Sequence, residues 1–379
     1  MKPIALVIPG LDRMGGAERQ TMLLAKGLAL RGWRVNVIAL SGTGGDAATE
    51  LTAAGVGFLS LRMRKGLADP RGWLRFRRWV RREKPEVVHA HLPHAAWMAR
   101  WSRLGAPVRV LVDTLHSSST GALGRHLGYR LSGWLPDAVS AVSRAVAEAH
   151  VAAGMVGREK VTVLPNGVDV EAWRPDPAVR AAVRQEFGLQ DEFLWFAVGR
   201  LEPVKDYPAL FRAMARVREP ARLVIAGTGP LEGELRRLTS ELGLESRVRF
   251  LGFEPNVRRW MQAADGFVLS SRWEGLPMGL LEAGSCALPA VATDVPGTRE
   301  VIVDGRTGSL AAAGSATAIE GAMTRMMRSS PEERKAMGER ARQRVIEQFS
   351  LEAVLDRWEE LYFGLLARNP RPRHWSGEG

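Results

Sequence analysis

Short apolar runs alternate with longer stretches of helical periodicity along most of the chain. Each short run has the length of a buried strand, and each longer stretch places apolar residues on one side of a helix. Such alternation predicts a parallel sheet with helices on both faces. In the first half, the expected strands are 3–8, 34–40, 56–61, 86–90, 107–113, 138–142 and 160–164, and the expected helices include 16–30, 70–84, 93–104 and 143–153.

The second half repeats this pattern after a segment, 165–177, that is rich in Pro, Asp, Asn and Gly and is expected to be a linker. Residues 368–379 have the composition of a disordered tail. The expected strands are 193–199, 222–226, 247–251, 266–270 and 289–292, and the C-terminal helices are 315–328, 331–348 and 350–366.

The predicted fold class is therefore α/β, with two Rossmann-like, doubly wound domains that face each other. A chain of 379 residues is too long for one typical core and suits two. We expect the first domain at 1–170 and the second at 171–348. In sheets of this kind, ligands bind beyond the carboxyl ends of the strands, where loops lead into helices.

Composition indicates the class of protein and the cellular compartment that we expect. Hydrophobic residues make up 46% of the chain and charged residues 25%, as in an ordinary globular protein. The single cysteine, Cys286, excludes a disulfide within the chain and fits a reducing compartment. The N-terminal apolar run is broken by Pro9 and Gly10, so it indicates a strand and not a signal peptide. No run is long enough to span a bilayer, and we expect a cytoplasmic protein.

The net charge of +12 is partly local, because residues 62–84 contain ten Lys or Arg and two Asp or Glu. Trp73, Phe76, Trp79 and Val80 recur there at helical spacing. One interpretation is a basic amphipathic helix on an anionic membrane surface. The favoured alternative is an ordinary helix whose aromatic side chains face the core and whose arginines face water. A nucleic-acid site is a third alternative, which no recognition motif supports.

Several strand ends of the first domain carry candidate ligand-binding residues. Gly15 and Gly16 open the helix after the first strand, where glycine permits close approach to the backbone and the helix N-terminus favours an anion; a plain tight turn is the alternative. His116 lies just past a strand end and suits a hydrogen bond to a substrate hydroxyl.

A second group of histidines, His89, His91 and His94, raises the question of a metal site. Their spacing does not match the common zinc patterns, and we expect His89 and His91 to point to opposite faces of their strand. We therefore predict no metal site.

In the second domain, the sequence GRLEPVK places Gly199 at a strand end, followed by Arg200 and Lys205. Two cations ahead of a helix suit a diphosphate, although a pair of surface charges is the alternative. The turn AGTG, with Gly227 after another strand, resembles a dinucleotide fingerprint whose third glycine is displaced to Gly233. A single glycine-rich turn of this kind is weak support for nucleotide binding.

The segment SSRWEGLPMGLLEAGSCAL carries two carboxylates in an apolar context. Glu274 is expected in a loop and Glu282 in the second turn of the helix that follows Pro277, so they would address separate groups of one ligand. The alternative is that Glu274 caps the helix and Glu282 is exposed, which the apolar neighbours of Glu282 argue against. The amides of Met278, Gly279 and Leu280 are expected to face the same ligand.

These residues together resemble the retaining GT-B glycosyltransferases of family 4. The resemblance runs from about residue 1 to 350 and rests on six motifs in order, of which the last has the family's two glutamates separated by seven residues. Met278 is a departure, because many relatives have phenylalanine or another large residue there. The motifs are GGAER (15–19), HSS (116–118), PNGVD (165–169), GRLEPVKDY (199–207), AGTGPLEGEL (226–235) and EGLPMGLLEA (274–283).

The resemblance implies an N-terminal domain that binds the acceptor and a C-terminal domain that binds a nucleotide-sugar, with the helix in 349–379 returning to the N-terminal domain. It implies that Glu282 holds the ribose, that Glu274 and His116 lie at the donor sugar, and that Arg200 and Lys205 bind the diphosphate. It places Gly16 beside the phosphates.

The implied reaction is transfer of a sugar to an acceptor hydroxyl with retention at the anomeric carbon. We expect no metal or other cofactor, since the chain contains no Asp-x-Asp, and we prefer front-face attack because no nucleophile is evident. The expected acceptor is a lipid-linked sugar or another envelope glycan precursor, which would place the enzyme on the inner face of the cytoplasmic membrane. The alternatives are a nucleotide-sugar epimerase of the same fold, a nicotinamide oxidoreductase and a non-catalytic scaffold.

Overall fold

The computed structural model describes residues 1–379 except 13, 65–68, 119–122, 190–191 and 371–379. The chain forms two compact units, of which unit 1 is Met1–Gly167 with Leu351–Gly379 and unit 2 is Val168–Ser350. The division between the units falls inside the predicted linker 165–177, three residues before the expected limit at residue 170. Most of the predicted tail, from residue 371 on, lies outside the described residues.

Unit 1 is built on a parallel sheet of seven strands in the order β3-β2-β1-β4-β5-β6-β7. The order reverses between β1 and β4, which is where doubly wound sheets bind ligands. The strands are β1 (Pro3–Ile8), β2 (Arg34–Ala39), β3 (Gly57–Ser60), β4 (Val87–His91), β5 (Val110–Leu115), β6 (Ala138–Ala141) and β7 (Val161–Val163). The helices are α1 (Gly16–Leu30), α2 (Gly45–Ala53), α3 (Pro70–Glu83), α4 (Pro93–Ser102), α5 (Leu123–Ser132), α6 (Arg144–Ala152) and α15 (Leu351–Arg368), with a 3-10 turn, η1 (Arg158–Lys160).

Unit 2 repeats the scheme with a parallel sheet of six strands in the order β10-β9-β8-β11-β12-β13, which reverses between β8 and β11. The strands are β8 (Phe193–Val198), β9 (Ala221–Ala226), β10 (Val248–Gly252), β11 (Gly266–Leu269), β12 (Ala290–Thr293) and β13 (Ser309–Ala311). The helices are α7 (Pro177–Glu186), α8 (Tyr207–Arg216), α9 (Glu232–Glu241), α10 (Val257–Ala263), α11 (Met278–Ser285), α12 (Pro296–Val301), α13 (Ala316–Arg328) and α14 (Pro331–Phe349), with a 3-10 turn, η2 (Pro203–Lys205).

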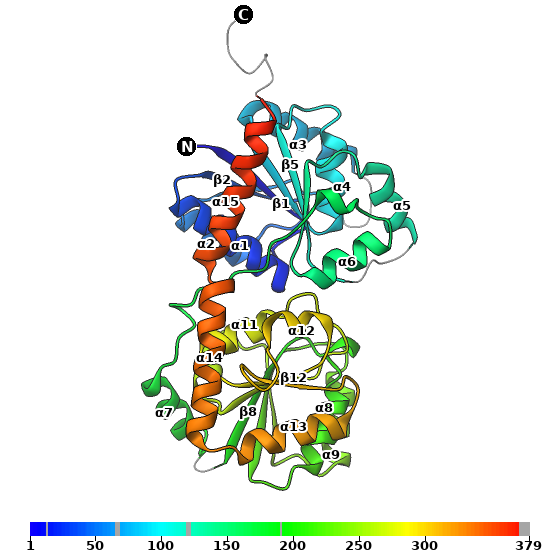
Figure 1. Cartoon of the computed structure of the whole chain (residues 1–379). Coiled ribbons are helices and arrows are strands. Elements are labelled where there is room, and N and C mark those ends of the chain that lie inside the picture. Colours follow the sequence, from blue (N-terminus) through cyan, green and yellow to red (C-terminus); the bar gives the residue numbers. More distant parts are fainter. Residues whose placement is uncertain (13, 65–68, 119–122, 190–191, 371–379) are drawn as a thin grey trace, which may run out of the picture. The chain divides into compact units, whose positions relative to one another are not determined.

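The last helix, α15, packs on α1 in the core of unit 1 (Figure 1). Its apolar side buries Leu355, Trp358 and Tyr362 against the sheet. The packing with α1 is close, since a Cβ added at Gly27 would lie 2.5 Å from Leu355 Cδ1. The two helices are also joined by Arg31, which pairs with carboxylates of α15. Helix α15 is therefore a structural part of the unit that contains residues 1–167.

Helix α3 decides between two interpretations of the basic segment 62–84. Phe76, Trp79 and Val80 are buried in unit 1, while the exposed side of the helix carries arginines. The favoured interpretation, in which the aromatic residues face the core, is thus correct for these three residues. They are not available for insertion into a membrane. Residues 65–68 of this segment lie outside the described part of the chain.

Candidate active site

The loops that follow β8 and β11 carry the charged residues of the candidate site in unit 2. These strands are neighbours at the point where the strand order reverses, and their carboxyl ends lie at the same edge of the sheet. Lys205 ends the turn η2 after β8, and Glu274 lies in the loop after β11. The topology thus brings together two residues that are 69 positions apart in sequence.

Lys205 and Glu274 form an ion pair in which Lys205 Nζ lies 2.6 Å from Glu274 Oε1. Their side chains are only 21% and 13% exposed. Ser271 Oγ also donates a hydrogen bond to Glu274 Oε1, at 2.6 Å. The carboxylate is therefore held by an ammonium and a hydroxyl in a partly dehydrated position, where each interaction is stronger than at the surface.

Backbone contacts hold the two loops against each other. Ser270 Oγ donates to the carbonyl oxygen of Lys205 at 2.7 Å, and the amide of Arg272 donates to Val204 O at 2.8 Å. On the other side of the Glu274 loop, a Cβ added at Gly297 would lie 2.5 Å from Glu274 O. Glu274 is consequently fixed from both sides, as a positioned ligand-binding group needs to be.

The glycines that follow β8 and β9 lie where the two loops approach each other closely. Gly227 has φ +145°, and a Cβ added to it would overlap the carbonyl oxygen of Gly199. The amide of Gly199 donates to Ala226 O and that of Leu201 to Thr228 O, both at 3.0 Å. The two loops therefore touch backbone to backbone, and this contact requires glycine at position 227.

Helix α11 begins at Met278, with Pro277 as its N-cap and not inside its first turn. Gly279 lies over the sheet, where a Cβ would be 3.0 Å from Phe267 Cζ. The expectation that Leu280 offers its amide to a ligand is wrong, because this amide donates to Pro277 O at 3.1 Å. Tightening of the first turn after proline accounts for this contact.

Glu282 is 5% exposed, as its apolar neighbours predicted, and it is not a surface residue of α11. Burial raises the pKa of the neighbouring Cys286 thiol to about 12, and the negative charge of Glu282 contributes to this rise. A carboxylate is rarely buried without a dedicated partner or function. Its position therefore supports a specific role for Glu282.

Arg200 does not join Lys205 in the described structure. Its side chain is 75% exposed, and its Nη1 lies 3.0 Å from Glu202 Oε1. The expected pair of cations is thus reduced to one partly buried ammonium, while the guanidinium of Arg200 lies in water on the loop after β8. Long basic side chains commonly keep their charged end in water in this way.

Tyr207 is a residue of this region for which the sequence suggested no role. It is 3% exposed and its hydroxyl donates to Gly199 O at 3.3 Å. Burial raises the pKa of Tyr207, with a further contribution from the charge of Glu274. The signal available in the sequence was its position two residues after Lys205, at the first turn of α8.

In unit 1, Gly15 and Gly16 lie at the start of α1, after β1. The amide of Gly15 donates to Glu18 Oε2 at 3.0 Å, and a Cβ at Gly15 would be 2.7 Å from this oxygen. Gly15 is therefore the N-cap of α1, and Glu18 occupies one donor of this helix terminus.

His116 follows β5 and is half-buried, with its Nε2 3.1 Å from His91 Nδ1. The expectation that His89 and His91 point to opposite faces is wrong, because their ring centroids are 4.1 Å apart. Residues two apart in a strand lie on the same face, so the spacing itself should have predicted this contact. Among the described residues, no group of three or more His, Cys, Asp or Glu side chains is arranged to hold a metal ion.

Burial lowers the pKa of His116 to about 4, and it lowers the pKa of both His89 and His91 well below the usual value. All three rings are therefore neutral near pH 7.

In the described part of the chain, no helix is both long enough and apolar enough to cross a bilayer.

The fold and the two strand-end clusters define a class, the two-domain α/β transferases of the GT-B type. Family models match both halves of the chain. The Glycosyltransferase Family 4 model matches residues 14–172, and the Glycosyl transferases group 1 model matches residues 179–344. The chain belongs to the group 1 glycosyltransferases and is a glycosyltransferase of the GT-B fold, which confirms the resemblance and the fold class predicted from the sequence.

Individual relatives and solved structures are also similar. N-acetyl-alpha-D-glucosaminyl L-malate synthase of Bacillus anthracis is 28% identical over 76% of this chain and 77% of its own. UDP-Gal:alpha-D-GlcNAc-diphosphoundecaprenol alpha-1,3-galactosyltransferase of Escherichia coli is 25% identical over 79% of this chain and 81% of its own. The crystal structure of Anabaena HepE in complex with UDP and glucose superimposes with a TM-score of 0.85 at 22% identity, covering 96% and 100% of the two chains, which shows a shared fold.

Proposed function

We propose that this glycosyltransferase takes its sugar from a nucleoside diphosphate sugar bound at the carboxyl edge of the unit 2 sheet. In the reaction, the bond between the anomeric carbon and the diphosphate oxygen breaks. A bond from the acceptor oxygen to that carbon forms, and the acceptor proton leaves with the diphosphate. The names of two relatives support this donor class, since one is a UDP-galactose-dependent enzyme and another uses GDP-mannose.

The observation that carries this proposal is the partly buried ion pair of Lys205 and Glu274. The ammonium supplies a positive charge where negative charge develops on the departing diphosphate. The carboxylate accepts hydrogen bonds from sugar hydroxyls, which come in pairs that its two oxygens suit. This ion pair thus supplies an ammonium for the diphosphate and a carboxylate for the sugar, which are the two groups joined by the bond that breaks.

The other residues complete the donor site in this proposal. Buried Glu282 binds the ribose hydroxyls, and His116 contacts the donor sugar. Met278 and Gly279 offer the N-terminus of α11 to the diphosphate. Arg200 exchanges its exposed contact with Glu202 for a phosphate oxygen, which costs little because exposed ion pairs contribute only about 0–1 kcal/mol.

We propose that the sugar is transferred with retention, by attack of the acceptor on the face from which the diphosphate departs. In this proposal Glu274 accepts hydrogen bonds from sugar hydroxyls, so it is not the nucleophile of a double displacement. The charge of the leaving group is met by Lys205 and Arg200, so this proposal requires no metal. The anomeric configuration of the product, determined by NMR, tests retention directly.

We propose a lipid-linked or other envelope glycan as the acceptor. Two relatives are named as transferases to diphospho-undecaprenol-linked sugars, one of them from Escherichia coli and one from Campylobacter jejuni. The exposed arginines of α3 would then hold unit 1 on anionic lipid mainly through charge, since Phe76 and Trp79 of that helix are buried. Arg71, Arg75, Arg78 and Arg82 form this exposed face.

A thermal-shift screen of nucleoside diphosphates and their sugars tests the donor class. A true donor raises the unfolding temperature with increasing concentration, because it binds the folded state alone. The matching sugar nucleotide should then release free nucleoside diphosphate on turnover with a glycan acceptor. If no nucleotide or nucleotide-sugar stabilises the fold at millimolar concentration, the proposed donor class is wrong.

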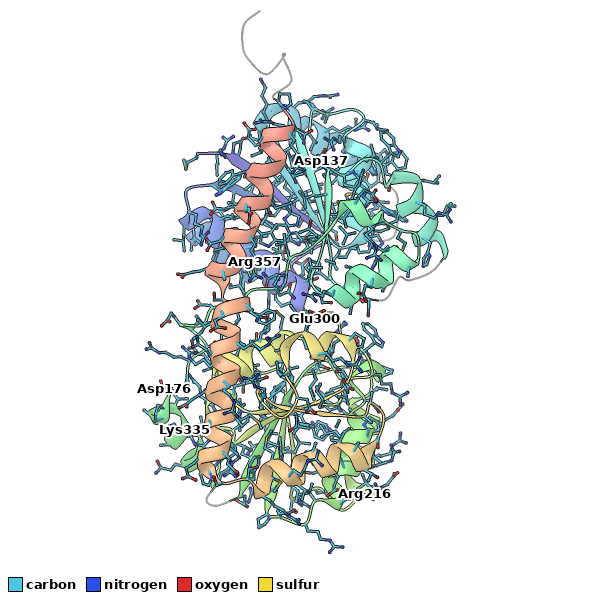
Figure 2. All side chains as sticks on the ribbon, viewed as in Figure 1. Asp137, Asp176, Arg216, Glu300, Lys335 and Arg357 are labelled. Carbon is cyan, nitrogen blue, oxygen red and sulfur yellow. The ribbon has the colours of Figure 1, made fainter. Side chains whose placement is uncertain are left out.

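Binding to liposomes tests the membrane proposal separately. We expect sedimentation with vesicles containing anionic lipid at low salt, and loss of binding at high salt. Replacing Arg71, Arg75 and Arg78 by glutamine should abolish sedimentation, whereas the same change at Arg216, an exposed arginine of unit 2 labelled in Figure 2, should not. Failure of the wild-type protein to bind would remove the membrane from the proposal and leave the donor site untouched.

A further inference from the structure

The contact between His91 and His116 constrains where the proton of each ring lies. His91 Nδ1 and His116 Nε2 are 3.1 Å apart, within hydrogen-bond distance. Both rings are neutral near pH 7, because burial lowers the pKa of each. A neutral imidazole has one N–H donor and one bare acceptor nitrogen, so one ring of the pair donates and the other accepts.

The second nitrogen of His91 distinguishes the two arrangements. His91 is 1% exposed, and its Nε2 is buried with no hydrogen-bond partner among the described residues. If His116 donated to His91, the proton of His91 would lie on Nε2 as a buried donor without an acceptor. If His91 donates from Nδ1, its Nε2 is a bare, buried nitrogen. Buried N–H groups without an acceptor are the rarer case in proteins, so the second arrangement is favoured.

The neighbouring ring of His89 is held in a defined state as well. Ser140 Oγ donates to Asp113 O at 3.4 Å, and a carbonyl oxygen only accepts. Working back from this carbonyl, Thr114 Oγ1 donates to Ser140 Oγ and His89 Nε2 donates to Thr114 Oγ1. His89 Nδ1 then accepts from the hydroxyl of Tyr362, at 2.7 Å. His89 therefore packs against His91 as a fixed neutral ring and is not a competing hydrogen-bond partner for it.

From this geometry we infer that His91 is a positioning residue that holds His116 in the tautomer protonated on Nδ1. The hydrogen bond occupies Nε2 of His116 and leaves Nδ1–H as a donor for a ligand. His116 thus offers a hydrogen bond to an oxygen atom, such as a sugar hydroxyl, and is not poised to remove a proton. The inference rests on the proposed role of His116 at the donor sugar.

The tautomer is measured directly in the full-length chain labelled with ¹⁵N-histidine. Long-range ¹⁵N–¹H spectra distinguish protonated from bare ring nitrogens, and the His116→Gln and His91→Asn variants assign the signals. We expect a protonated Nδ1 and a bare Nε2 for His116, and the same for His91. A bare Nδ1 on His116 would overturn the inference, whatever the activity of the enzyme.

Kinetics then test the consequence for transfer. In His91→Asn, the amide nitrogen takes the place of Nδ1 and still donates, whereas His91→Leu removes the donor. We expect kcat to fall about tenfold in the leucine variant, the loss of one ordinary hydrogen bond, and to recover within about twofold in the asparagine variant. The matched control is His94→Leu, since His94 is exposed in the same segment and lies outside this network.

The outcomes separate this inference from the proposed function. Equal activity of the leucine and asparagine variants would overturn the positioning role, provided that both fold by circular dichroism. If His116→Gln kept full activity while the spectra showed the expected tautomer, the proposed role of His116 would be wrong and the structural state of the ring would stand. If the leucine variant fails to fold, the spectra and the asparagine variant still decide the matter.

Discussion

Lys205 Nζ lies 2.6 Å from Glu274 Oε1, and the two residues belong to loops that follow neighbouring strands of one sheet. Each charge compensates the other in the absence of a ligand, which lowers the cost of keeping both away from water. A bound diphosphate would compete with Glu274 for the ammonium. The carboxylate would then be released for the sugar.

Replacing Lys205 by alanine should reduce the release of nucleoside diphosphate by about 10²–10³-fold, because one preorganised charge at the leaving group is lost. Circular dichroism should be unchanged. The control is Lys335→Ala, which removes an exposed lysine on α14, labelled in Figure 2, from a pair with Glu339. Near-normal turnover of the Lys205 variant would reject its place in the site.

Replacing Glu282 by glutamine should weaken nucleotide binding by about tenfold to a hundredfold. Hydrogen bonds to a charged group contribute about 1.5–3 kcal/mol, and glutamine loses the charge while keeping the shape. Isothermal titration calorimetry with the nucleotide that best stabilises the fold measures this change. The control is Glu241→Gln, which changes an exposed glutamate and should leave the dissociation constant of the nucleotide unaltered. If Glu282→Gln also left this dissociation constant unaltered, Glu282 would not bind the ribose.

Replacing Gly227 by alanine should destabilise unit 2 by about 3 kcal/mol, since the new Cβ overlaps Gly199 O and the backbone has φ +145°. Gly233 provides the contrast within the same glycine-rich sequence. It lies in α9, and a Cβ there meets nothing within 4 Å. Alanine at 233 should be neutral or stabilise by about 0.5–1 kcal/mol. Equal urea midpoints for the two variants would contradict the backbone contact.

Stability should fall as the pH drops below about 6.5. The pKa of His116 is lowered to about 4 and those of His89 and His91 are lowered well below the usual value, so the unfolded chain binds more protons than the folded one in this window. Each such histidine costs about 1.4 kcal/mol of unfolding free energy per pH unit, and above pH 6.5 this contribution is constant.

Urea unfolding of unit 1 at pH 7.5 and pH 5.5 measures this dependence. The loss between the two values should be smaller in His91→Asn than in the wild type, because one of the histidines no longer titrates. An unchanged loss in the His91 variant would show that its protonation is not linked to folding.

Much of the fold could be predicted from the sequence because both sheets are parallel and buried. Strands buried on both faces form continuous apolar runs, and the predicted strand 3–8 and helix 16–30 match β1 and α1 in the structure. The short strand β13 (Ser309–Ala311) was missed, because a segment of three residues at the sheet edge is too brief to show a pattern.

The candidate site was harder to predict, for reasons of geometry. Loop positions after strands were correct for Lys205 and Glu274, but the sequence does not say which way a long side chain points. Arg200 is therefore in water, although its spacing suggested a place beside Lys205. The contact between the rings of His89 and His91 follows from the two-residue period of a strand, which places both side chains on the same face.

Because α15 supplies Trp358 and Tyr362 to the core of unit 1, the order in which the two units are synthesised differs from the order in which they can finish folding. The strands of the unit 1 sheet are synthesised before unit 2, yet one hydrophobic face of this sheet is covered only after α15 has been synthesised. Unit 2, whose residues are contiguous, is able to finish folding earlier. A premature stop codon shortly after Ser350 would thus destabilise unit 1, which is synthesised first, and leave unit 2 able to fold.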